Sequence, residues 1–421
     1  MISIVADFFY LVFVIAVLPY YIIKFFTVPS SRLGLFERFG FMSPSKSEKS
    51  VIWLHGASVG ELKSAEGLIK KLREQYKDYE LVLSSITPTA QLLLRKIYPD
   101  LRSVTFPIDL SWAVKRSIKK INPKLIVLLE QEIWPNFIQA ASARNIPVVL
   151  IGARITEKSL RRYNILSWIF KPTLNRISHF GVQDESYFTR YKTLGVPDDK
   201  MTITGNMKYD NIPNPQITDT RLQMELGIKG MDIVLIGGST HSSEEEVLLE
   251  AYKSLKADIK NLRLVLAPRH PERFHDVEDL IRAKGHECVR YSKRDNAKSQ
   301  TAVIFIDTMG ELMKIYQLAT IVFVGGSLVS KGGHNILEPI ALGKPAIFGP
   351  YMYNFQESAD ALIKAGACVM IKDKNKLTGK IRELLARPDF NEIGKRGLEF
   401  IKSKRGATDN NLRIISRILS R

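Results

Sequence analysis

The chain has 421 residues, which is more than a single ordinary hydrophobic core accommodates. Hydrophobic residues make up 45% and charged residues 25%, a composition that excludes a disordered or low-complexity protein. Its 61 basic and 43 acidic residues give a formal net charge of +18, which indicates an anionic partner: nucleic acid, an anionic membrane surface or a phosphorylated substrate. The two cysteines, Cys288 and Cys368, exclude a disulfide framework and a cysteine-rich zinc site, and we expect two free thiols in a reducing compartment.

The first segment, residues 2–23, is mostly apolar but is interrupted by Asp7 and Pro19. A helix of this length spans the hydrocarbon core of a bilayer, which predicts a membrane anchor over residues 1–27. Basic residues follow the segment and none precedes it, which favours a cytoplasmic location for the rest of the chain and argues against a cleaved signal peptide. The alternative is a helix lying in the membrane interface, which the aromatic residues of the segment would suit.

Beyond residue 50, short apolar runs alternate with amphipathic stretches, a pattern typical of parallel strands buried between helices. The runs of the first half are residues 51–56, 80–86, 103–108, 125–130, 147–153, 177–182 and 201–205. The runs of the second half are residues 232–238, 262–268, 288–292, 302–307, 320–326, 345–349 and 367–371.

This alternation predicts an α/β protein with two doubly wound, Rossmann-like domains. A segment rich in Asn, Pro and Thr at residues 206–220 is the predicted linker. We place the N-terminal domain at residues 28–205 and the C-terminal domain at residues 221–421, whose last helix can pack back on the N-terminal domain. Ligands are expected at the carboxyl ends of the strands, in a cleft between the two domains.

Acidic residues follow two strands of the first half. Glu61 ends the run HGASVGE and falls in the first turn of a helix, where a carboxylate can accept a proton from an incoming hydroxyl. The alternative is that Glu61 only complements the helix dipole. Glu130 and Glu132 follow the fourth strand, and their side chains point to the same side if the strand continues through both. The alternative there is a charged loop before a helix that begins near Pro135.

Strand ends of the second half carry glycine-rich and basic segments that suit phosphate groups. The run Gly237–His241 precedes a helix and offers free backbone N–H groups, with Ser239 and Thr240 as further donor contacts. Arg269, after Pro268, is placed to form two hydrogen bonds with a phosphate or a base edge, and the alternative is a surface salt bridge.

A second glycine-rich segment, residues 325–339, contains two Gly-Gly pairs. Backbone amides from Asn335 onward suit a phosphate, and Glu338 suits ribose hydroxyls. The seven histidines form no HxxxH or HExxH pair, and no GxGxxG follows a strand. The sequence therefore predicts no metal site and no cofactor, and it argues against a dinucleotide oxidoreductase.

Basic residues are concentrated in the first half, between Lys115 and Lys124 and between Arg144 and Arg176. Beside the apolar N-terminal segment, they predict a surface for anionic lipid headgroups, and the alternative is a solvated helix face without a partner.

Read together, the motifs of the chain resemble those of the Kdo (3-deoxy-D-manno-oct-2-ulosonic acid) transferase family, in family order over nearly the whole chain. The matching segments are HGASVGE (55–61), SSITPTA (84–90), PIDLSWAV (107–114), EQEIWPN (130–136), GARITEKS (152–159), GNMKYD (205–210), GGSTHSSEEE (237–246), LAPRHPERF (266–274), DTMGELMKIY (307–316), GGSLVSKGGHNILEP (325–339) and GPYMYNFQE (349–357). The chain departs from the usual pattern at Gly56-Ala57, at Gln131 and at Gly152-Ala153-Arg154, none of which removes a proposed functional group.

The resemblance implies a GT-B glycosyltransferase on the cytoplasmic face of the bacterial inner membrane, held by an N-terminal signal anchor. It would transfer Kdo from CMP-Kdo to a lipid A precursor, lipid IVA, in lipopolysaccharide inner-core synthesis, with inversion and without a metal. By motif position, Glu61 matches the proton acceptor, and Glu130 and Lys208 match supports of the transition state. The positions that match CMP-binding segments are Pro268, Arg269, Met309, Gly310, Glu311, Asn335, Ile336, Leu337 and Glu338.

Two rival functions remain at this point. One is another GT-B transferase that uses a UDP-sugar and a membrane-lipid acceptor. The other is a basic, membrane-tethered protein that binds nucleic acid, although the chain has no RNA-binding aromatic signature and no helix-turn-helix pattern. We therefore expect no nucleic-acid partner.

Overall fold

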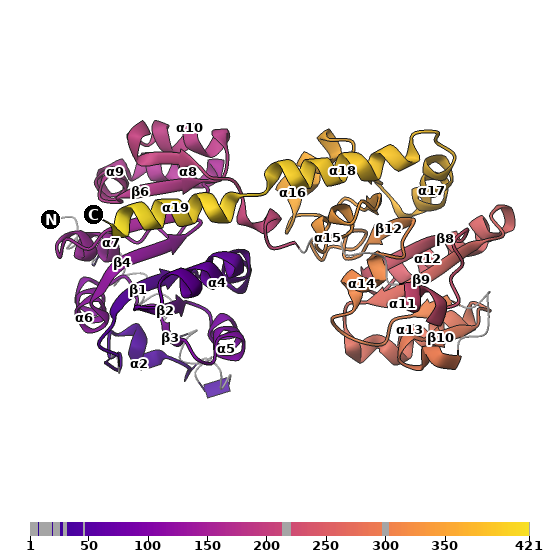
Figure 1. Ribbon diagram of the computed structural model, residues 1–421, viewed down its shortest axis with the longest axis horizontal. Helices are drawn as coiled ribbons and strands as arrows, with labels where there is room; N and C mark the ends of the chain where they lie inside the picture. The colour runs from indigo at the N-terminus through magenta and orange to yellow at the C-terminus, as the bar shows by residue number, and fades with distance from the viewer. Residues whose placement is uncertain are drawn as a thin grey trace. The chain divides into compact units, whose positions relative to one another are not determined.

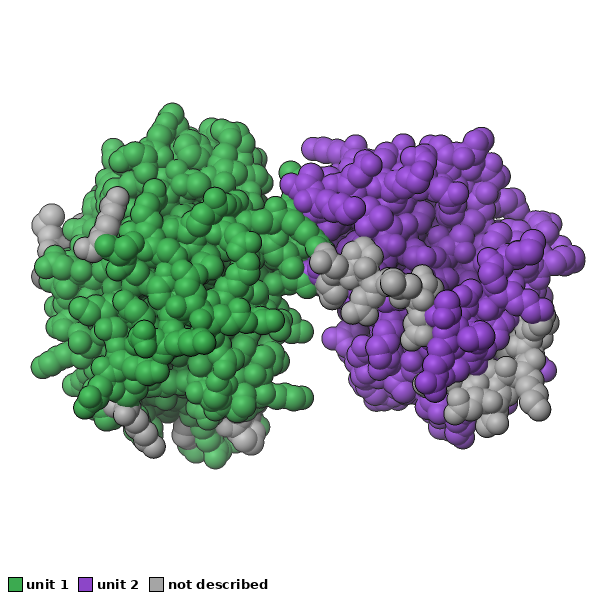
Figure 2. Space-filling view, viewed as in Figure 1, with its two compact units in different colours: residues 1–211, 404–421 green, residues 212–403 purple. Residues whose placement is uncertain are grey.

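The computed structural model describes residues 7, 19, 26–27, 32–44, 47–212, 220–296 and 303–420. The predicted anchor over residues 1–27 thus lies almost wholly outside the described residues. Within the described ranges, no helix is long and apolar enough to cross a membrane. The chain divides into two compact units, unit 1 with residues 1–211 and 404–421 and unit 2 with residues 212–403 (Figure 2).

Unit 1 contains a seven-stranded sheet in the order β3-β2-β1-β4-β5-β6-β7, in which every pair of neighbours is parallel (Figure 1). Its strands are β1 (Ser50–His55), β2 (Tyr79–Ser85), β3 (Arg102–Thr105), β4 (Pro123–Leu129), β5 (Val148–Ala153), β6 (His179–Val182) and β7 (Met201–Ile203). Each strand falls on a predicted apolar run, because a strand covered on both faces must be apolar throughout.

Helices cover both faces of the unit 1 sheet. They are α2 (Leu35–Arg38), α3 (Val59–Ser64), α4 (Glu66–Gln75), α5 (Pro88–Ile97), α6 (Ser111–Ile121), α7 (Pro135–Ser142), α8 (Glu157–Ile165), α9 (Ser167–Asn175), α10 (Glu185–Thr193), η2 (Asp198–Lys200), η3 (Met207–Tyr209) and α19 (Ala407–Leu419). Neighbouring side chains of β1 belong to different cores, since strand side chains alternate between faces. Trp53 lies in one core with residues of α6 and α7, and Leu54 lies in the other with residues of α4, α5 and α19.

The last helix, α19, belongs to unit 1 although residue 403 ends unit 2. Its Ile414 and Ile415 are buried in the same core as Met207. Asp210 accepts hydrogen bonds from the backbone N–H groups of Gly406 at 2.7 Å and Thr408 at 2.6 Å, at the start of α19. Residues 404–421 lie in unit 1, in agreement with the expectation that the last helix can pack back on the N-terminal domain. The predicted boundary differs at residues 206–211, which were placed in the linker and lie in unit 1.

Unit 2 contains a second parallel sheet of seven strands, in the order β10-β11-β9-β8-β12-β13-β14. Its strands are β8 (Ile233–Thr240), β9 (Leu262–Pro268), β10 (Cys288–Arg290), β11 (Val303–Phe305), β12 (Ile321–Val324), β13 (Ala346–Phe348) and β14 (Cys368–Met370). Its helices are α11 (Thr220–Glu225), α12 (Glu244–Asp258), η4 (Pro271–Arg273), α13 (Phe274–Ala283), η5 (Tyr291–Asn296), α14 (Leu312–Tyr316), α15 (Leu337–Ala341), α16 (Gln356–Lys364), η6 (Lys374–Lys376), α17 (Leu377–Leu385) and α18 (Phe390–Lys404). The two parallel sheets confirm the predicted pair of doubly wound domains. Cys288 and Cys368 are free thiols.

Candidate active site

The acidic loops of unit 1 meet because of the strand order. β1 lies between β2 and β4: strands β2 and β3 extend the sheet on one side of β1, and β4 to β7 extend it on the other, so the strand order reverses between β1 and β4. In such sheets the loops that leave the two strands on either side of this point diverge and form a ligand-binding crevice at their carboxyl ends. Glu61 follows β1, and Glu130 and Glu132 follow β4, so all three belong to this crevice.

The carboxylate of Glu61 is held by the turn that starts α3. Ser58 is the N-cap residue, and its hydroxyl accepts the N–H of Glu61 at 3.4 Å and donates to Glu61 Oε1 at 3.0 Å. The backbone N–H of Ala57 donates to Glu61 Oε2 at 2.7 Å. This is a variant of the capping box, in which the third helical residue satisfies the helix start. The orientation of the Glu61 side chain is therefore set by its own turn.

The environment of Glu61 changes its acidity. Burial, followed by the negative charges of Glu132 and Glu130, raises the pKa of Glu61 to about 7, against the effect of the two hydrogen bonds. A general base works best when its pKa lies near the operating pH. Complementing the helix dipole alone would lower the pKa of Glu61, so the capping role and the acidity of this group point to different functions.

Glu130 occupies an unfavourable backbone conformation at the end of β4. The strand ends at Leu129, and Glu130 has φ of 52°, which side chains other than glycine rarely adopt. The strand therefore does not continue through Glu132, and the segment is the alternative given above, a charged loop before a helix that begins at Pro135. The Glu130 carboxylate is buried and pairs with the guanidinium of Arg154 at 2.6 Å. This ion pair satisfies the charge of Glu130.

Glu132 belongs to a hydrogen-bonded network that the sequence analysis missed. Its Oε2 lies 3.2 Å from Nε2 of His55 and accepts from the indole N–H of Trp134 at 2.7 Å. The other ring nitrogen of His55 lies 3.0 Å from the hydroxyl of Ser84. His55 stacks on Phe106 with ring centroids 3.6 Å apart. The position of His55 as the last residue of β1 is the signal that could have identified it.

Lys208 lies in η3 and is half-buried. Its backbone N–H donates to the side chain of Asn206 at 3.0 Å. Among the residues that the structure describes, no ion pair joins the Lys208 ammonium group to Glu61 or Glu130. The structure thus brings Glu61, Glu130 and Glu132 into electrostatic contact and leaves Lys208 outside their network.

The strand order of unit 2 creates a second crevice of the same kind. β8 lies between β9 and β12, and the strand order reverses between β8 and β12. The loops that follow β8 and β12 therefore meet at this point. Glu244, the first residue of α12, connects them. Its Oε2 accepts the N–H groups of His241 at 2.9 Å and Gly326 at 2.7 Å, and its Oε1 accepts those of Ser327 at 3.0 Å and Leu328 at 2.9 Å. A buried carboxylate thus already occupies these four N–H donors.

This arrangement corrects two expectations about phosphate binding. The run Gly237–His241 is not a free loop, because β8 extends to Thr240. The N–H of His241 is bonded to Glu244, so it is not available to a phosphate. The side chain of Thr240 is fully buried, whereas Ser239, with φ of 54°, is partly exposed. Of these two expected donor contacts, Ser239 alone therefore has a side chain that reaches solvent.

The other nucleotide-binding candidates follow the ends of β9, β11 and β12. Pro268 ends β9 and is buried, and the next residue, Arg269, is exposed while its N–H donates to the carbonyl of Thr240 at 3.0 Å. Met309 is 53% exposed, and Gly310 has φ of 89° with open space around its Cα. A flat ring can approach the backbone there, because no heavy atom outside Met309 and Glu311 lies within 4 Å of the position that a Cβ of residue 310 would take.

Glu311 and Glu338 are both engaged within unit 2. Glu311 pairs with the ammonium of Lys314 at 3.0 Å. The side-chain amide of Asn335 donates to Glu338 at 3.0 Å, and its carbonyl oxygen accepts the N–H of Leu337 at 3.2 Å. Ile336 and Leu337 are buried. Asn335 and Glu338 therefore form one polar pair at the start of α15.

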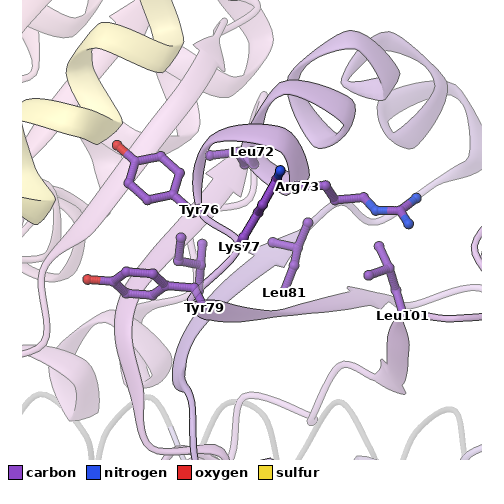
Figure 3. Close-up of a pocket in the computed structure, with 8 residues that line it drawn as sticks. Leu72, Arg73, Tyr76, Lys77, Tyr79, Leu81 and Leu101 are labelled. Carbon is purple, nitrogen blue, oxygen red and sulfur yellow. The ribbon is translucent and has the colours of Figure 1, made fainter.

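The described residues form a pocket of about 190 Å³ in unit 2, lined by residues that include Glu244 and Leu328. Within the described ranges, no group of three or more His, Cys, Asp and Glu side chains could hold a metal ion. Figure 3 shows a pocket of about 220 Å³ in unit 1, lined by residues that include Arg73, Tyr76, Lys77 and Tyr79. It lies at the amino-terminal end of β2, whereas Glu61 follows the carboxyl-terminal end of β1. None of the predicted site residues lines this pocket.

Two family models match the chain, one in each of the two compact units. A family model for 3-deoxy-D-manno-octulosonic-acid transferase (kdotransferase) matches residues 34–211, and a model for glycosyl transferases group 1 matches residues 232–398. A glycosyltransferase from Rickettsia africae superposes with a TM-score of 0.56 at 16% identity, over 89% of this chain and 99% of that chain. With the two doubly wound units, these matches define a glycosyltransferase of the GT-B fold.

Curated relatives identify the family. The 3-deoxy-D-manno-octulosonic acid transferase of Haemophilus influenzae is 35% identical over 93% of this chain and 93% of its own length. The corresponding transferase of Chlamydophila psittaci is 31% identical over 88% of this chain and 86% of its own length. The chain belongs to the 3-deoxy-D-manno-octulosonic acid transferase family.

Proposed function

We propose that this protein transfers Kdo from CMP-Kdo to a lipid A precursor, lipid IVA, in a single displacement that inverts the anomeric carbon. Family membership supports the sugar and the reaction type, since the relatives are named as transferases of this sugar. No metal or other cofactor takes part in this scheme.

The observation that carries the proposal is the pKa of Glu61, raised to about 7 by burial and by two neighbouring carboxylates. Near neutral pH such a group is partly ionised and still basic enough to remove a proton from a primary hydroxyl as the oxygen attacks. The hydrogen bonds from Ala57 and Ser58 hold its carboxylate in one orientation. Because an inverting transfer needs one base and no enzyme nucleophile, a single oriented carboxylate is sufficient.

Charge support is assigned to Glu130 and Lys208. The negative charge of Glu130, whose carboxylate pairs with Arg154, is one of the causes that raise the pKa of Glu61. Lys208 is free to offset the charge of the Kdo carboxylate or the leaving phosphate, since no described acidic group neutralises it.

Nucleotide binding is assigned to unit 2. The exposed guanidinium of Arg269 suits the phosphate, and the open surface at Met309-Gly310 suits the cytosine ring. The Asn335–Glu338 pair suits the ribose hydroxyls, because a carboxylate accepts hydrogen bonds from hydroxyl groups.

We place the protein on the cytoplasmic face of the bacterial inner membrane. Helix α6 supports this placement, because its basic side chains at residues 115, 116, 119 and 120 are all exposed. Trp112, on the same helix, is 47% exposed, and Phe41 is 58% exposed. The guanidinium of Arg116 lies 4.4 Å from the centroid of the Phe41 ring. Exposed aromatic rings beside basic groups suit an anionic lipid surface.

The test is a transfer assay with the purified full chain, CMP-Kdo and a tetraacyl lipid A precursor, followed by mass spectrometry of the lipid. The expected product is heavier by one or more Kdo residues. A calorimetric panel of CMP and UDP separates the rival glycosyltransferase, since we expect CMP to bind and UDP not to bind. Absence of a Kdo-bearing product together with UDP binding would refute the proposal, as would affinity for RNA or DNA at physiological salt without CMP binding.

A further inference from the structure

Two histidines of unit 2 form a direct ring-to-ring hydrogen bond that the proposed reaction does not use. Nε2 of His241 lies 2.8 Å from Nε2 of His334, and the two ring planes are within 5° of parallel with centroids 5.1 Å apart, so the rings lie end to end. His241 follows the end of β8 and His334 lies in the loop after β12. The pair therefore joins the two loops that meet at the reversal point of the sheet.

The geometry of this pair limits its proton content. A hydrogen bond between two Nε2 atoms needs one protonated and one unprotonated Nε2, so two neutral rings share one Nε2–H. The ring that donates through Nε2 has a bare Nδ1, and the ring that accepts carries its proton on Nδ1. One added proton goes to the bare Nδ1 and leaves the Nε2–Nε2 bond intact. The protonated pair then has a charge of +1 and two Nδ1–H donors.

The surroundings hold the pair neutral in the unliganded protein. Burial is the main cause that lowers the pKa of His241 to about 4, followed by the charges of His270, Arg273, Lys331 and Arg269. Burial also lowers the pKa of His334 to about 4, with His241, Arg269 and His270 as the further causes. The His270 ring packs edge-on against His241 at 5.2 Å.

The acidic groups nearby are already engaged. Glu244 accepts four backbone N–H groups, and Glu245 forms two hydrogen bonds with Arg273, at 2.9 and 3.1 Å. Glu272 lies 3.4 Å from His270. Arg269 and Lys331 are exposed. The site thus combines two exposed cations with a neutral imidazole pair that can accept one more proton.

We propose that His241 and His334 form a proton-linked anion site, which takes up one proton when an anionic group of the sugar nucleotide binds. The inference rests on the proposed function, because it takes the ligand to be a phosphodiester or carboxylate of the donor. Bound anionic charge stabilises the imidazolium form, so the proton comes from solvent and no covalent bond changes. Release of the anion returns the proton.

This coupling has a definite sign. In the free protein the pair is neutral above its lowered pKa, and in the complex the pKa is raised by the anion. Between these two values each bound anion brings a proton, so affinity strengthens as pH falls, by at most about tenfold per pH unit. A permanently charged lysine at the same place would give no such dependence.

The experiment is isothermal titration calorimetry of the full chain at pH 6.5 in buffers of different ionisation enthalpy. The probes are the methyl ester of CMP, which has a phosphodiester and no carboxylate, and free Kdo, which has a carboxylate and no phosphate. We expect uptake of about one-third to one proton per bound probe from at least one of them. Uptake with the ester assigns the site to the phosphodiester, and uptake with Kdo alone assigns it to the carboxylate.

Variants locate the proton. Uptake should vanish in His241→Asn/His334→Asn and persist in His275→Asn, which changes an exposed histidine of α13. Uptake that persists in the double variant and vanishes in His270→Asn would overturn the proposal and assign the proton to His270. Binding of the ester to the unaltered chain, with proton uptake from neither the ester nor Kdo, would overturn this inference alone. Failure of CMP and its ester to bind at all would refute the proposed function as well.

Discussion

Ser58 and Glu61 satisfy one another at the start of α3: the Ser58 hydroxyl accepts the N–H of Glu61 and donates to its carboxylate at 3.0 Å. The same carboxylate has a pKa raised to about 7, chiefly by burial. One residue therefore serves both as a structural cap and as the candidate base. The two roles are compatible, because the cap fixes orientation while burial sets acidity.

Replacing Glu61 by Gln should abolish most of the transfer and leave nucleotide binding intact. Glutamine keeps the size of the side chain but cannot take a proton from the acceptor, so we expect kcat to fall about 10²- to 10⁴-fold. The dissociation constant for CMP should not change, since the nucleotide site is proposed to lie in unit 2. Glu66→Gln, an exposed position in α4, is the control. Turnover at the unaltered rate in Glu61→Gln would remove Glu61 from its role.

The pH profile should report the titration of Glu61. The ionised form is the active base, so kcat/KM should rise with pH and level off above a midpoint near the pKa of about 7. In Glu132→Gln the loss of a neighbouring negative charge should move the midpoint to lower pH by less than about one unit, because burial is the larger cause. A midpoint that is unchanged in Glu132→Gln would contradict the electrostatic coupling.

Glu244→Gln should loosen the loop after β12. A glutamine amide presents one nitrogen donor where the carboxylate accepts two N–H groups on each oxygen, so two donors lose their partner. We expect a local destabilisation of about 2–4 kcal/mol. Hydrogen exchange of residues 326–328 should accelerate, and CMP affinity should fall. Glu246→Gln, exposed in the first turn of the same helix, is the control, and equal exchange rates in the two variants would argue against the role of Glu244.

Arg269→Ala should weaken CMP binding about 10- to 100-fold, the effect of losing hydrogen bonds to a charged group. Arg282→Ala provides a matched loss of charge on α13, where Arg282 is paired with Glu278 at 2.9 Å. Calorimetry with CMP and with cytidine measures both variants. Cytidine should bind both variants equally, because it lacks the phosphate. Equal weakening of CMP binding in both variants would indicate a general charge effect instead of a contact.

Asp210→Ala should loosen α19 from unit 1. The Asp210 carboxylate accepts two N–H groups at the start of this helix, and losing such a cap costs about 0.5–2 kcal/mol. Faster hydrogen exchange along α19, with unit 2 unaffected, is the expected result. Asp198→Ala removes an exposed ion pair with Lys192 and serves as the comparison. If exchange in α19 is the same in both variants, Asp210 does not hold the helix.

Much of the fold was predictable because its signals are local. All fourteen strands of the two sheets fall on predicted apolar runs. The motif ending in Glu61 was recognisable from a strand, two glycines and a helix start. The predicted start of the linker at residue 206 was less accurate. Met207 is buried in the unit 1 core, and residues 206–211 belong to unit 1.

Residue spacing could not reveal which groups meet. Glu132 and His55 are 77 positions apart and contact through adjacent parallel strands. Glu244 and Gly326 are 82 positions apart, and their bond depends on β8 and β12 being neighbours. A phosphate loop and a loop filled by the protein's own carboxylate have the same glycine-rich pattern, so the pattern does not distinguish them.

The amino-acid sequence alone established the two α/β series, the acidic and glycine-rich segments at the strand ends, and the resemblance to a transferase family. These signals are local, because hydrophobic periodicity and motif spacing are properties of short segments. Only the folded structure revealed the raised pKa of Glu61, the occupation of four N–H donors by Glu244 and the His241–His334 pair. Each of these depends on burial or on contacts between distant segments, and both arise when strands are ordered in a sheet and helices pack against it.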